Sequence, residues 1–315
     1  RYIDLRISTL PTNFGEKVVI RLLDRVMLMK SVTEIGLLPA QLTQILEVLN
    51  LPQGTILVVG PTGSGKTTTQ YAMVNELLKK DLNIITVEDP IEYEIHGASQ
   101  VQVNEKAGLT FAGCLRSVLR QDPNVILIGE IRDTETAKLA VQASMTGHLV
   151  LSTLHTKDAI SAVTRLENLD IEPYLISSSI NLIMAQRLMR MVCAHCREEY
   201  FPPQESLKRV EAFFEEHLSF SFYHGKGCSH CNGTGYFGRI GVFEVMRLSP
   251  KVGELIMSGV SEPEVRRAAA EEGMQSIFND AIEKLKKGLT TLEEIEKVFI
   301  LTEEELMVCP HCKRS

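Results

Sequence analysis

The sequence predicts an α/β fold with a mostly parallel central sheet. From Gln53 onward, four apolar runs alternate with stretches of helical spacing, at 55–59, 83–87, 125–128 and 148–154. This is the pattern of strands joined by helical crossovers. Polar or charged residues follow each run. Because ligands bind at the carboxyl edge of an open parallel sheet, the four segments after these strands are expected to meet at one site.

The segments on either side of this core have their own signatures. Residues 2–23 alternate like a β-hairpin around a turn at 11–15, and a short helix is expected at 37–50. After about residue 192 the strand signals fade into a cysteine-rich segment, and from 249 to 307 the pattern is helical. The chain is therefore expected to hold a core, a cysteine-rich module and a helical C-terminal part.

Composition limits the classes of protein to consider. With 315 residues and 44% hydrophobic content, the chain is long enough for two or three modules. No apolar run approaches the ~18 residues that a bilayer span requires, and no signal-peptide pattern is present, so cytoplasmic residence is expected. The net charge of -7 disfavours nucleic acid as a partner. Because Arg1 opens the chain inside a strand-like pattern, a fragment lacking its N-terminal part is expected.

The strand at 55–59 runs into a motif that fills every fixed position of the phosphate-binding pattern G-x-x-x-x-G-K-[ST], and a helical pattern follows. The expected nucleotide-binding residues are Gly60, Pro61, Thr62, Gly63, Ser64, Gly65, Lys66, Thr67 and Thr68. Backbone N–H groups of such a loop face the β-phosphate, Lys66 supplies charge to the β- and γ-phosphates, and the Thr67 hydroxyl is a ligand for Mg²⁺. We therefore expect ATP with Mg²⁺ as the bound nucleotide, and hydrolysis of it.

The next strands also end in chemically useful groups. The third strand ends in Gly129 and Glu130, with glycine where P-loop ATPases commonly carry an aspartate. Glu130 is then assigned as general base or as the residue that orients the attacking water, with Glu88 as its helper. Two ordinary interpretations stay open, because Glu88 could simply open a loop and His155 could be a helix cap or a core histidine.

Cysteine spacing provides a second, independent signal. Four of the seven cysteines form two Cys-x-x-Cys pairs with 31 residues between them: Cys193, Cys196, Cys228 and Cys231. This spacing predicts a closed tetrahedral Zn²⁺ site that folds a small module. His195 and His230 are expected to be spectators. Cys309 and Cys312 form a third pair, which is interpreted as a free tail pair or as a metal site shared across subunits.

Together these motifs resemble those of the assembly ATPases of type II secretion and type IV pilus systems, within the secretion-ATPase superfamily. The resemblance covers essentially the whole chain. It rests on the phosphate loop at 60–67, the acidic box TVEDPIE at 86–92, the segment ILIGEIRD at 126–133 and the histidine box TGHLVLSTLH at 146–155. The Gly-Glu ending at Gly129 is the pattern of this family.

The resemblance implies a homo-hexameric ring in which ATP lies between an N-terminal domain and a RecA-like domain. The fold class it implies is a RecA-like P-loop core with a small tetracysteine zinc module and a C-terminal helical subdomain. The expected boundaries are 1–30 for the end of a truncated N-terminal domain with its linker, 31–192 for the core, 193–240 for the zinc module and 241–315 for the helical subdomain.

The resemblance also assigns roles to residues outside the phosphate loop. The arginines that reach the γ-phosphate in this family fall on Arg6 and Arg21. His148 and His155 are carried over as conformational or γ-phosphate-sensing groups. Without the resemblance, the two arginines would be read as surface residues of strands.

The tetracysteine module favours one branch of the superfamily, because pilus retraction motors lack it. The implied function is a motor for assembly of a type IV pilus or a type II secretion pseudopilus at the cytoplasmic face of the inner membrane. An inner-membrane platform protein and other pilus or secretion components are its implied partners, and they provide its peripheral membrane association.

Two alternatives come from other classes. A RecA-like motor acting on nucleic acid, in DNA transfer or uptake, is disfavoured by the acidic balance of four Lys or Arg against six Glu within 193–231. A zinc-bearing binding module is suggested because 228–235 reads Cys-x-x-Cys-x-Gly-x-Gly, as in chaperone zinc domains. That alternative does not account for the four aligned ATPase segments.

Overall fold

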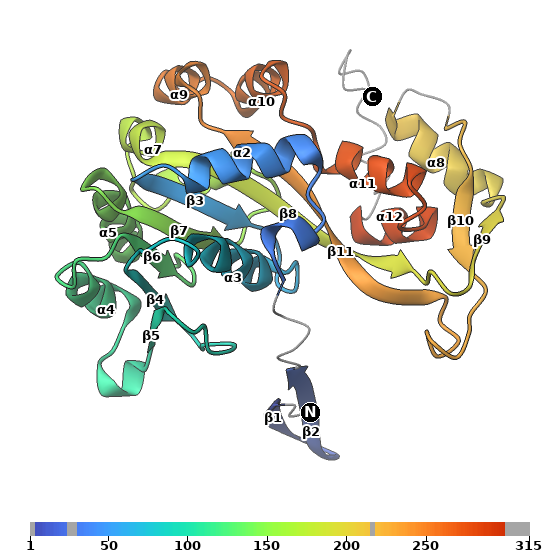
Figure 1. The fold of residues 1–315 in the computed structure, drawn as a ribbon, viewed down its shortest axis with the longest axis horizontal. Helices are drawn as coiled ribbons and strands as arrows, with labels where there is room; N and C mark the ends of the chain where they lie inside the picture. The colour runs from blue at the N-terminus through green and yellow to red at the C-terminus, as the bar shows by residue number, and fades with distance from the viewer. Residues whose placement is uncertain (1–3, 24–29, 215–217, 300–315) are drawn as a thin grey trace.

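The computed structural model describes residues 4–23, 30–214 and 218–299. Its centre is a seven-stranded sheet (Figure 1). The strands of this sheet are β3 (Gly54–Val59), β4 (Ile84–Glu88), β5 (Ser99–Gln102), β6 (Val125–Ile128), β7 (Leu149–Leu154), β8 (Ile180–Val192) and β11 (Tyr236–Arg247). Their order is β11-β8-β3-β7-β6-β4-β5, and every neighbouring pair is parallel except β8 with β11. The predicted fold class is confirmed.

The four strands predicted from apolar runs are present as β3, β4, β6 and β7, with bounds within one residue of those expected. All residues of these four strands are buried, which explains why their sequences are mostly apolar. The apolar runs do not predict β5, β8 and β11. In β8 and β11, charged residues such as Arg187, Arg190 and Glu244 interrupt the apolar signal.

Helices cover both faces of the sheet. The helices are α2 (Pro39–Leu49), α3 (Lys66–Leu77), α4 (Phe111–Val118), α5 (Thr134–Met145), α6 (Ile160–Glu167), α7 (Pro173–Ser179), α8 (Gln204–Phe214), α9 (Pro250–Met257), α10 (Glu262–Glu271), α11 (Ile277–Lys286) and α12 (Leu292–Phe299), with short 3-10 turns η1 (Val32–Glu34) and η2 (Glu105–Ala107). Alternate residues of β3 enter different cores. Ile56 and Val58 pack with α2 and α3, whereas Leu57 and Val59 pack with α4, α5, α6 and α7.

A second body of structure surrounds the far ends of β8 and β11 (Figure 1). These two long strands pair antiparallel and reach beyond the central sheet toward the cysteine-rich segment. There they meet α8, α11, α12 and a small antiparallel sheet of β9 (Arg197–Tyr200) and β10 (Phe222–Gly225). A third apolar core, which includes Met189 of β8 and Val242 of β11, holds these elements together. Strand β11 passes through residue 240, and the four domain boundaries given above stay predictions.

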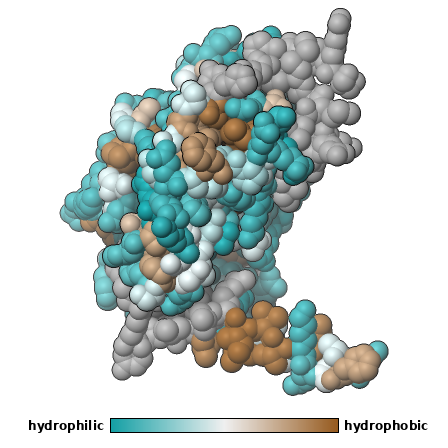
Figure 2. All heavy atoms as spheres, turned by 90° about the vertical axis from the view of Figure 1, so that its right-hand side faces the viewer, coloured by the Kyte–Doolittle hydropathy of each residue, from teal (hydrophilic) through white to brown (hydrophobic). Residues whose placement is uncertain are grey.

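The N-terminal hairpin consists of β1 (Asp4–Thr12) and β2 (Gly15–Leu23). One of its faces presents Leu5, Ile7, Val18 and Ile20, each at least half exposed. Figure 2 shows exposed apolar side chains of the hairpin in brown at the lower edge of the view. Among the described residues, none of the helices combines the length and the apolar character that a membrane span needs.

Candidate nucleotide site and tetracysteine centre

The phosphate loop connects the end of β3 to the start of α3, and it is built around close backbone contacts. Gly65, the N-cap of α3, has φ 90°, a conformation that favours glycine. A Cβ on Gly65 would lie 2.9 Å from Nε2 of Gln186, and one on Gly60 would lie 2.5 Å from the Gln186 carbonyl oxygen. The loop therefore packs directly on β8. The N-terminus of α3 faces the loop, and the backbone N–H groups at such a helix end favour binding of an anion.

Two side chains of the loop indicate that it fits a phosphate. Lys66 Nζ donates to the carbonyl oxygens of Gly60 and Pro61, at 2.8 and 3.1 Å, so its ammonium lies against the loop itself. Partial burial lowers the pKa of Lys66, with the Glu130 carboxylate opposing this shift and Arg187 adding to it. The Ser64 hydroxyl is buried and has no hydrogen-bond partner among the described residues. A bound phosphate would give the Ser64 hydroxyl its missing acceptor and would offer the Lys66 ammonium an anionic one.

Glu130 lies at the same edge, directly after β6. Its Oε2 is 3.3 Å from Nε2 of His155, and its Oε1 accepts a 2.5 Å bond from Arg132. Arg132 is in turn 3.8 Å from an oxygen of Asp89. Burial opposes ionisation of Glu130, but Arg132 and His155 outweigh it and hold the pKa of this carboxyl below its usual value. An ionised Glu130 is suited to accept a hydrogen bond from water.

Glu88 occupies a different environment from Glu130. Its side chain is only 3% exposed. It accepts hydrogen bonds from Thr86 Oγ1 at 2.6 Å, from Gln100 Nε2 at 3.2 Å and from the Tyr71 hydroxyl. Burial, together with the charge of Glu88, raises the pKa of Tyr71 and keeps it a proton donor. These contacts join α3, β4 and β5, and the helper role assigned to Glu88 stays a prediction.

The two histidines of the histidine box lie at opposite ends of β7. His155 follows the carboxyl end and contacts Glu130, whereas His148 precedes the amino end. His148 Nδ1 is 2.9 Å from the Ala143 carbonyl oxygen at the end of α5. At about 3.3 Å per residue, the strand separates the two histidines by roughly 20 Å. The structure therefore brings His155, but not His148, to Glu130, and the sensing roles of both stay predictions.

Arg6 and Arg21 are directly opposite each other in the register of β1 and β2. The Arg6 side chain is exposed. Their expected role at the γ-phosphate stays a prediction.

Two further residues, Gln186 and Arg187, lie beside the phosphate loop, because Val59 of β3 pairs with Ala185 of β8. Gln186 accepts a 2.8 Å hydrogen bond from the Thr69 hydroxyl of α3. Sequence reasoning missed both residues because it missed β8.

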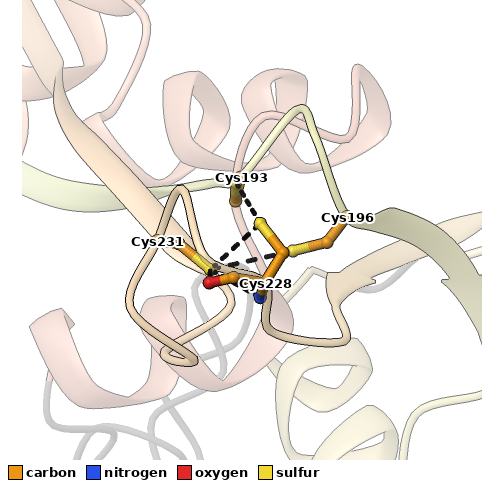
Figure 3. Close-up of side chains that lie close together, drawn as sticks. All are labelled: Cys193, Cys196, Cys228 and Cys231. Atoms are coloured by element: carbon orange, nitrogen blue, oxygen red, sulfur yellow. Dashed lines mark hydrogen bonds between the residues drawn. The ribbon is translucent and has the colours of Figure 1, made fainter.

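The four predicted zinc ligands converge in space (Figure 3). Their Sγ atoms lie within 4.8 Å of one another, with separations of 3.9 Å for Cys193–Cys228, 3.8 Å for Cys196–Cys231 and 3.7 Å for Cys228–Cys231. A tetrahedron with Zn–S bonds of about 2.3 Å has edges of about 3.8 Å. The cluster therefore fits Zn²⁺. The third predicted pair, Cys309 and Cys312, lies outside the described residues.

Backbone amides support the cluster. The Cys231 sulfur accepts N–H groups from Cys228 at 3.2 Å and Gly235 at 3.3 Å, an arrangement that stabilises a thiolate ligand. The rings of His195 and His230 contact each other at a tilt of 45°, with their centroids 4.1 Å apart. The cysteines come from the turn after β8 and the turn between β10 and β11.

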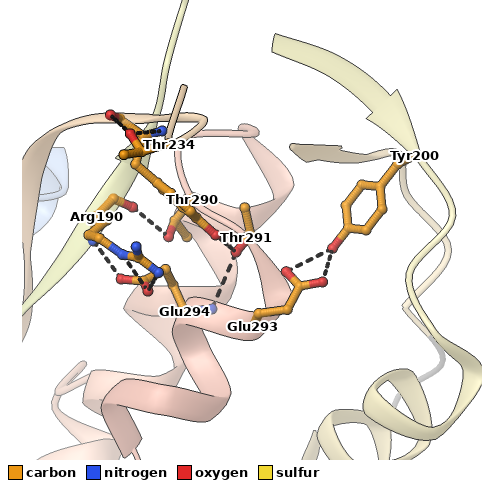
Figure 4. Close-up of polar contacts among 8 residues, drawn as sticks. Arg190, Tyr200, Thr234, Thr290, Thr291, Glu293 and Glu294 are labelled. Atoms are coloured by element: carbon orange, nitrogen blue, oxygen red, sulfur yellow. Dashed lines mark hydrogen bonds and ion pairs between the residues drawn. The ribbon is translucent and has the colours of Figure 1, made fainter. Parts of the chain in front are cut away.

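Helix α12 is bonded to the strand that enters the cluster (Figure 4). Arg190 of β8 donates through its backbone N and its Nε to the Glu294 carboxylate, at 2.9 and 2.7 Å. Thr290 returns a 3.0 Å bond to the Arg190 carbonyl oxygen, and Tyr200 of β9 donates to Glu293 at 2.8 Å. The last described helix is therefore part of the same unit as the tetracysteine centre.

The strand, glycine loop and helix N-terminus arranged around Lys66 define a P-loop nucleotide-binding protein. Comparison with known families then identifies the branch. The chain belongs to the Type II/IV secretion system protein family, whose model matches residues 1–297. The resemblance stated from the motifs is confirmed.

Individual relatives agree with this assignment. The chain is 44% identical to the type IV pilus assembly ATPase PilB of Thermus thermophilus, over 93% of this chain and 33% of PilB. It is 46% identical to the type II secretion system protein E of Aeromonas hydrophila, over 95% of this chain and 59% of the relative. A crystal structure of the pilus retraction motor PilT with bound ADP superposes with a TM-score of 0.67 at 26% identity, covering 95% of this chain and 74% of PilT. The chain thus spans only part of the length of these relatives.

Proposed function

We propose that this protein is an ATP-hydrolysing motor that powers assembly of a type IV pilus or a type II secretion pseudopilus. One observation carries the proposal: the phosphate loop with Lys66 lies at the same sheet edge as the ionised Glu130 and its contact His155. The groups that bind the phosphates and the carboxylate that can act on the attacking water then lie at one edge of the sheet. The family membership and the pilus and secretion ATPases among its relatives support the particular process.

The residues have distinct roles in this proposal. Lys66 and the loop amides bind the ATP phosphates, and Thr67, the second residue of α3, is the protein ligand for Mg²⁺. Mg²⁺ supplies neutralisation of charge on the phosphates when bound. Glu130 orients the attacking water. Because its pKa is held low, this carboxyl is ionised at neutral pH, so it is better suited to accept a hydrogen bond from the water than to take up and keep a proton. His155 keeps Glu130 in place from the next strand end.

The ring and its arginines extend the proposal. Six copies would place the N-terminal hairpin of the protein near an ATP site, where Arg6 and Arg21 could neutralise charge on the transferred phosphoryl group. In this arrangement, Arg6→Ala or Arg21→Ala lowers turnover more than nucleotide affinity. Turnover at the wild-type level in both variants would remove that role. Lys17→Ala, on the same hairpin, is the matched control.

The cellular setting also belongs to the proposal. The motor acts at the cytoplasmic face of the inner membrane, held there through a platform protein and other pilus or secretion components. The presence of a tetracysteine centre that can bind Zn²⁺ supports a role in filament assembly rather than in retraction. Pull-down with a candidate platform protein, using the wild type and a zinc-depleted sample, tests this part separately from the chemistry.

The decisive experiment measures ATP hydrolysis by the protein and by Lys66→Ala. We expect phosphate release from the wild type and at most a residual rate from the variant, since Lys66 supplies the charge of the loop. Lys79→Ala changes an exposed lysine just beyond the same helix and should hydrolyse ATP like the wild type. A wild type that neither binds nor hydrolyses ATP would overturn the proposal. Binding to DNA that weakens with salt would instead support a nucleic-acid motor.

A further inference from the structure

The segment that carries His155 is held in place by residues that lie far from it in the sequence. Residues 155–159, here called the histidine loop, connect β7 to α6. The His155 side chain is about half exposed, so packing alone does not fix its position against Glu130. The rest of the histidine loop is bonded from the sheet on one side and from helix α10 on the other.

The sheet contributes two contacts. Glu244 of β11, which is 2% exposed, accepts the backbone N–H of Ala159 through Oε1 at 3.0 Å. Arg187 of β8 donates to the carbonyl oxygen of Lys157 at 2.8 Å. Ala185 pairs with Glu244 in the register of the two strands, so both contacts come from one stretch of the β8–β11 ribbon. The ribbon thereby fixes the backbone of the histidine loop at two points.

Helix α10 contributes a third contact through Arg266. Its two terminal nitrogens reach Glu244 Oε2 at 3.2 Å and Asp158 Oδ2 at 3.1 Å, so one guanidinium bridges the strand and the histidine loop. The other oxygen of Asp158 accepts the Ser161 N–H at 2.8 Å. A planar guanidinium can satisfy two carboxylates in fixed directions, which a flexible ammonium does less well.

A further bond joins the helices behind the histidine loop. The Thr164 hydroxyl of α6 donates to Glu262 at the start of α10, at 2.7 Å. Helix α10 is therefore linked both to the histidine loop and to the helix that follows it. A shift of α10 relative to the sheet would change the position of the segment that carries His155.

We propose that Arg266 and Glu244 are positioning residues, which hold the histidine loop so that His155 keeps its contact with Glu130, and which thereby couple helix α10 to the nucleotide site. This inference rests on the function proposed above. Neither residue is part of the phosphate loop, because Arg266 lies in α10 and Glu244 in β11. A misplacement of about 1 Å at a reacting centre can lower a rate by roughly 100-fold, so a small movement of the histidine loop is enough to matter.

The test uses Arg266→Ala and Arg266→Lys, with Arg267→Ala as the control, because Arg267 is the exposed neighbour on the same helix. We expect kcat for ATP to fall by about 10-fold in Arg266→Ala, with nucleotide Kd changed by less than about 2-fold. Arg266→Lys should fall less, because a lysine reaches one carboxylate at a time. Equal kcat values in Arg266→Ala and Arg267→Ala would overturn the inference.

A double-mutant comparison separates positioning from general stability. In a His155→Ala background, Arg266→Ala should lower kcat by less than about 2-fold, because the residue it positions is already absent. The same fold loss in both backgrounds would mean that Arg266 does not act through His155, and would overturn the inference.

Hydrogen exchange supplies a readout that does not depend on hydrolysis. The Ala159 amide, which is bonded to Glu244, should exchange at least about 10-fold faster in Arg266→Ala and in Glu244→Ala than in Arg267→Ala. Unchanged exchange in both variants would overturn the inference even if the protein hydrolyses ATP. A wild type without ATPase activity would refute the proposed function, and the exchange rates would still report whether Arg266 and Glu244 hold the histidine loop.

Discussion

His155 and Glu130 contact each other across two neighbouring strand ends, with 3.3 Å between Nε2 and Oε2. The contact follows from the parallel pairing of β6 and β7, in which Ile128 lies opposite Ser152. The residues two and three positions further on therefore leave the sheet together. Because Arg132 binds the other oxygen of Glu130, this carboxylate is oriented from two directions. An oriented, ionised carboxylate beside the phosphate loop is the feature that most of the expected chemistry depends on.

Replacing Glu130 by glutamine should separate binding from turnover. Glu130→Gln keeps the size of the side chain but removes the charge, so we expect ATP affinity near that of the wild type and turnover lower by roughly 100-fold or more. Glu135→Gln is the matched control, since Glu135 is an exposed carboxylate bonded to Arg116. Fluorescent-nucleotide binding and phosphate release measure the two quantities, and normal turnover in Glu130→Gln would contradict the assignment.

Removing one ligand of the tetracysteine centre should cost both metal and stability. We expect Cys231→Ser to lose zinc and to unfold at a lower temperature, because structural zinc contributes directly to folding. Cys114→Ser changes a buried cysteine of α4 outside the cluster and should retain its zinc. Metal analysis and thermal unfolding of the wild type, Cys231→Ser and Cys114→Ser test this prediction. Full zinc content in Cys231→Ser would show that the cluster is not a four-ligand zinc site.

The buried ion pair between Asp280 and Lys284 predicts a large effect on stability. Both side chains are at most 3% exposed, and their charged atoms are 2.6 Å apart. Lys284 also donates to the Gly241 carbonyl oxygen, and Asp280 accepts the Phe243 N–H, so the pair fastens α11 to β11. Lys284→Met leaves Asp280 buried without this cation, which should lower the free energy of unfolding by about 3–5 kcal/mol.

The comparison for this pair is the double variant Asp280→Asn, Lys284→Met. Because no unpaired carboxylate stays buried in it, we expect it to lose less stability than the sum of the two single variants. Urea unfolding of all four proteins gives the coupling between the two residues. Simple additivity would mean that the contact contributes little beyond the separate side chains.

Glu244 predicts a specific dependence of stability on pH. Burial raises the pKa of this carboxyl above its usual value of 4.5, although Ala159 and Arg266 oppose the shift. Above pH 4.5 the folded state then binds more protons at Glu244 than the unfolded state does. Protonation of Glu244 therefore favours the folded state at low pH, and this stabilisation is lost as the pH rises through the folded-state pKa. Glu244→Gln lacks the titration. Urea midpoints from about pH 5 to pH 7.5 should therefore fall more in the wild type than in the variant, and parallel curves would contradict the prediction.

Much of the nucleotide site is visible in the local sequence. The phosphate loop and the strand before it could be predicted because the loop geometry requires glycines at set positions and the strand is buried and mostly apolar. The tetracysteine centre could be predicted because metal ligation demands a fixed ligand type at short spacing. These features depend on neighbours along the chain, and they also sufficed to indicate the family.

The supports of the site depend on contacts between distant segments, and local sequence does not show them. Gln186 sits against the phosphate loop only because β8 pairs with β3, and its strand carries too many polar residues to be predicted from apolar runs. The sequence predicts a helper role for Glu88 but not its surroundings, in which its oxygens bond to Tyr71, Thr86 and Gln100. The bridge from Arg266 to the histidine loop spans more than one hundred residues. Residue type and spacing determined the chemistry that is available here, whereas strand order and side-chain direction in three dimensions decided which of those groups meet.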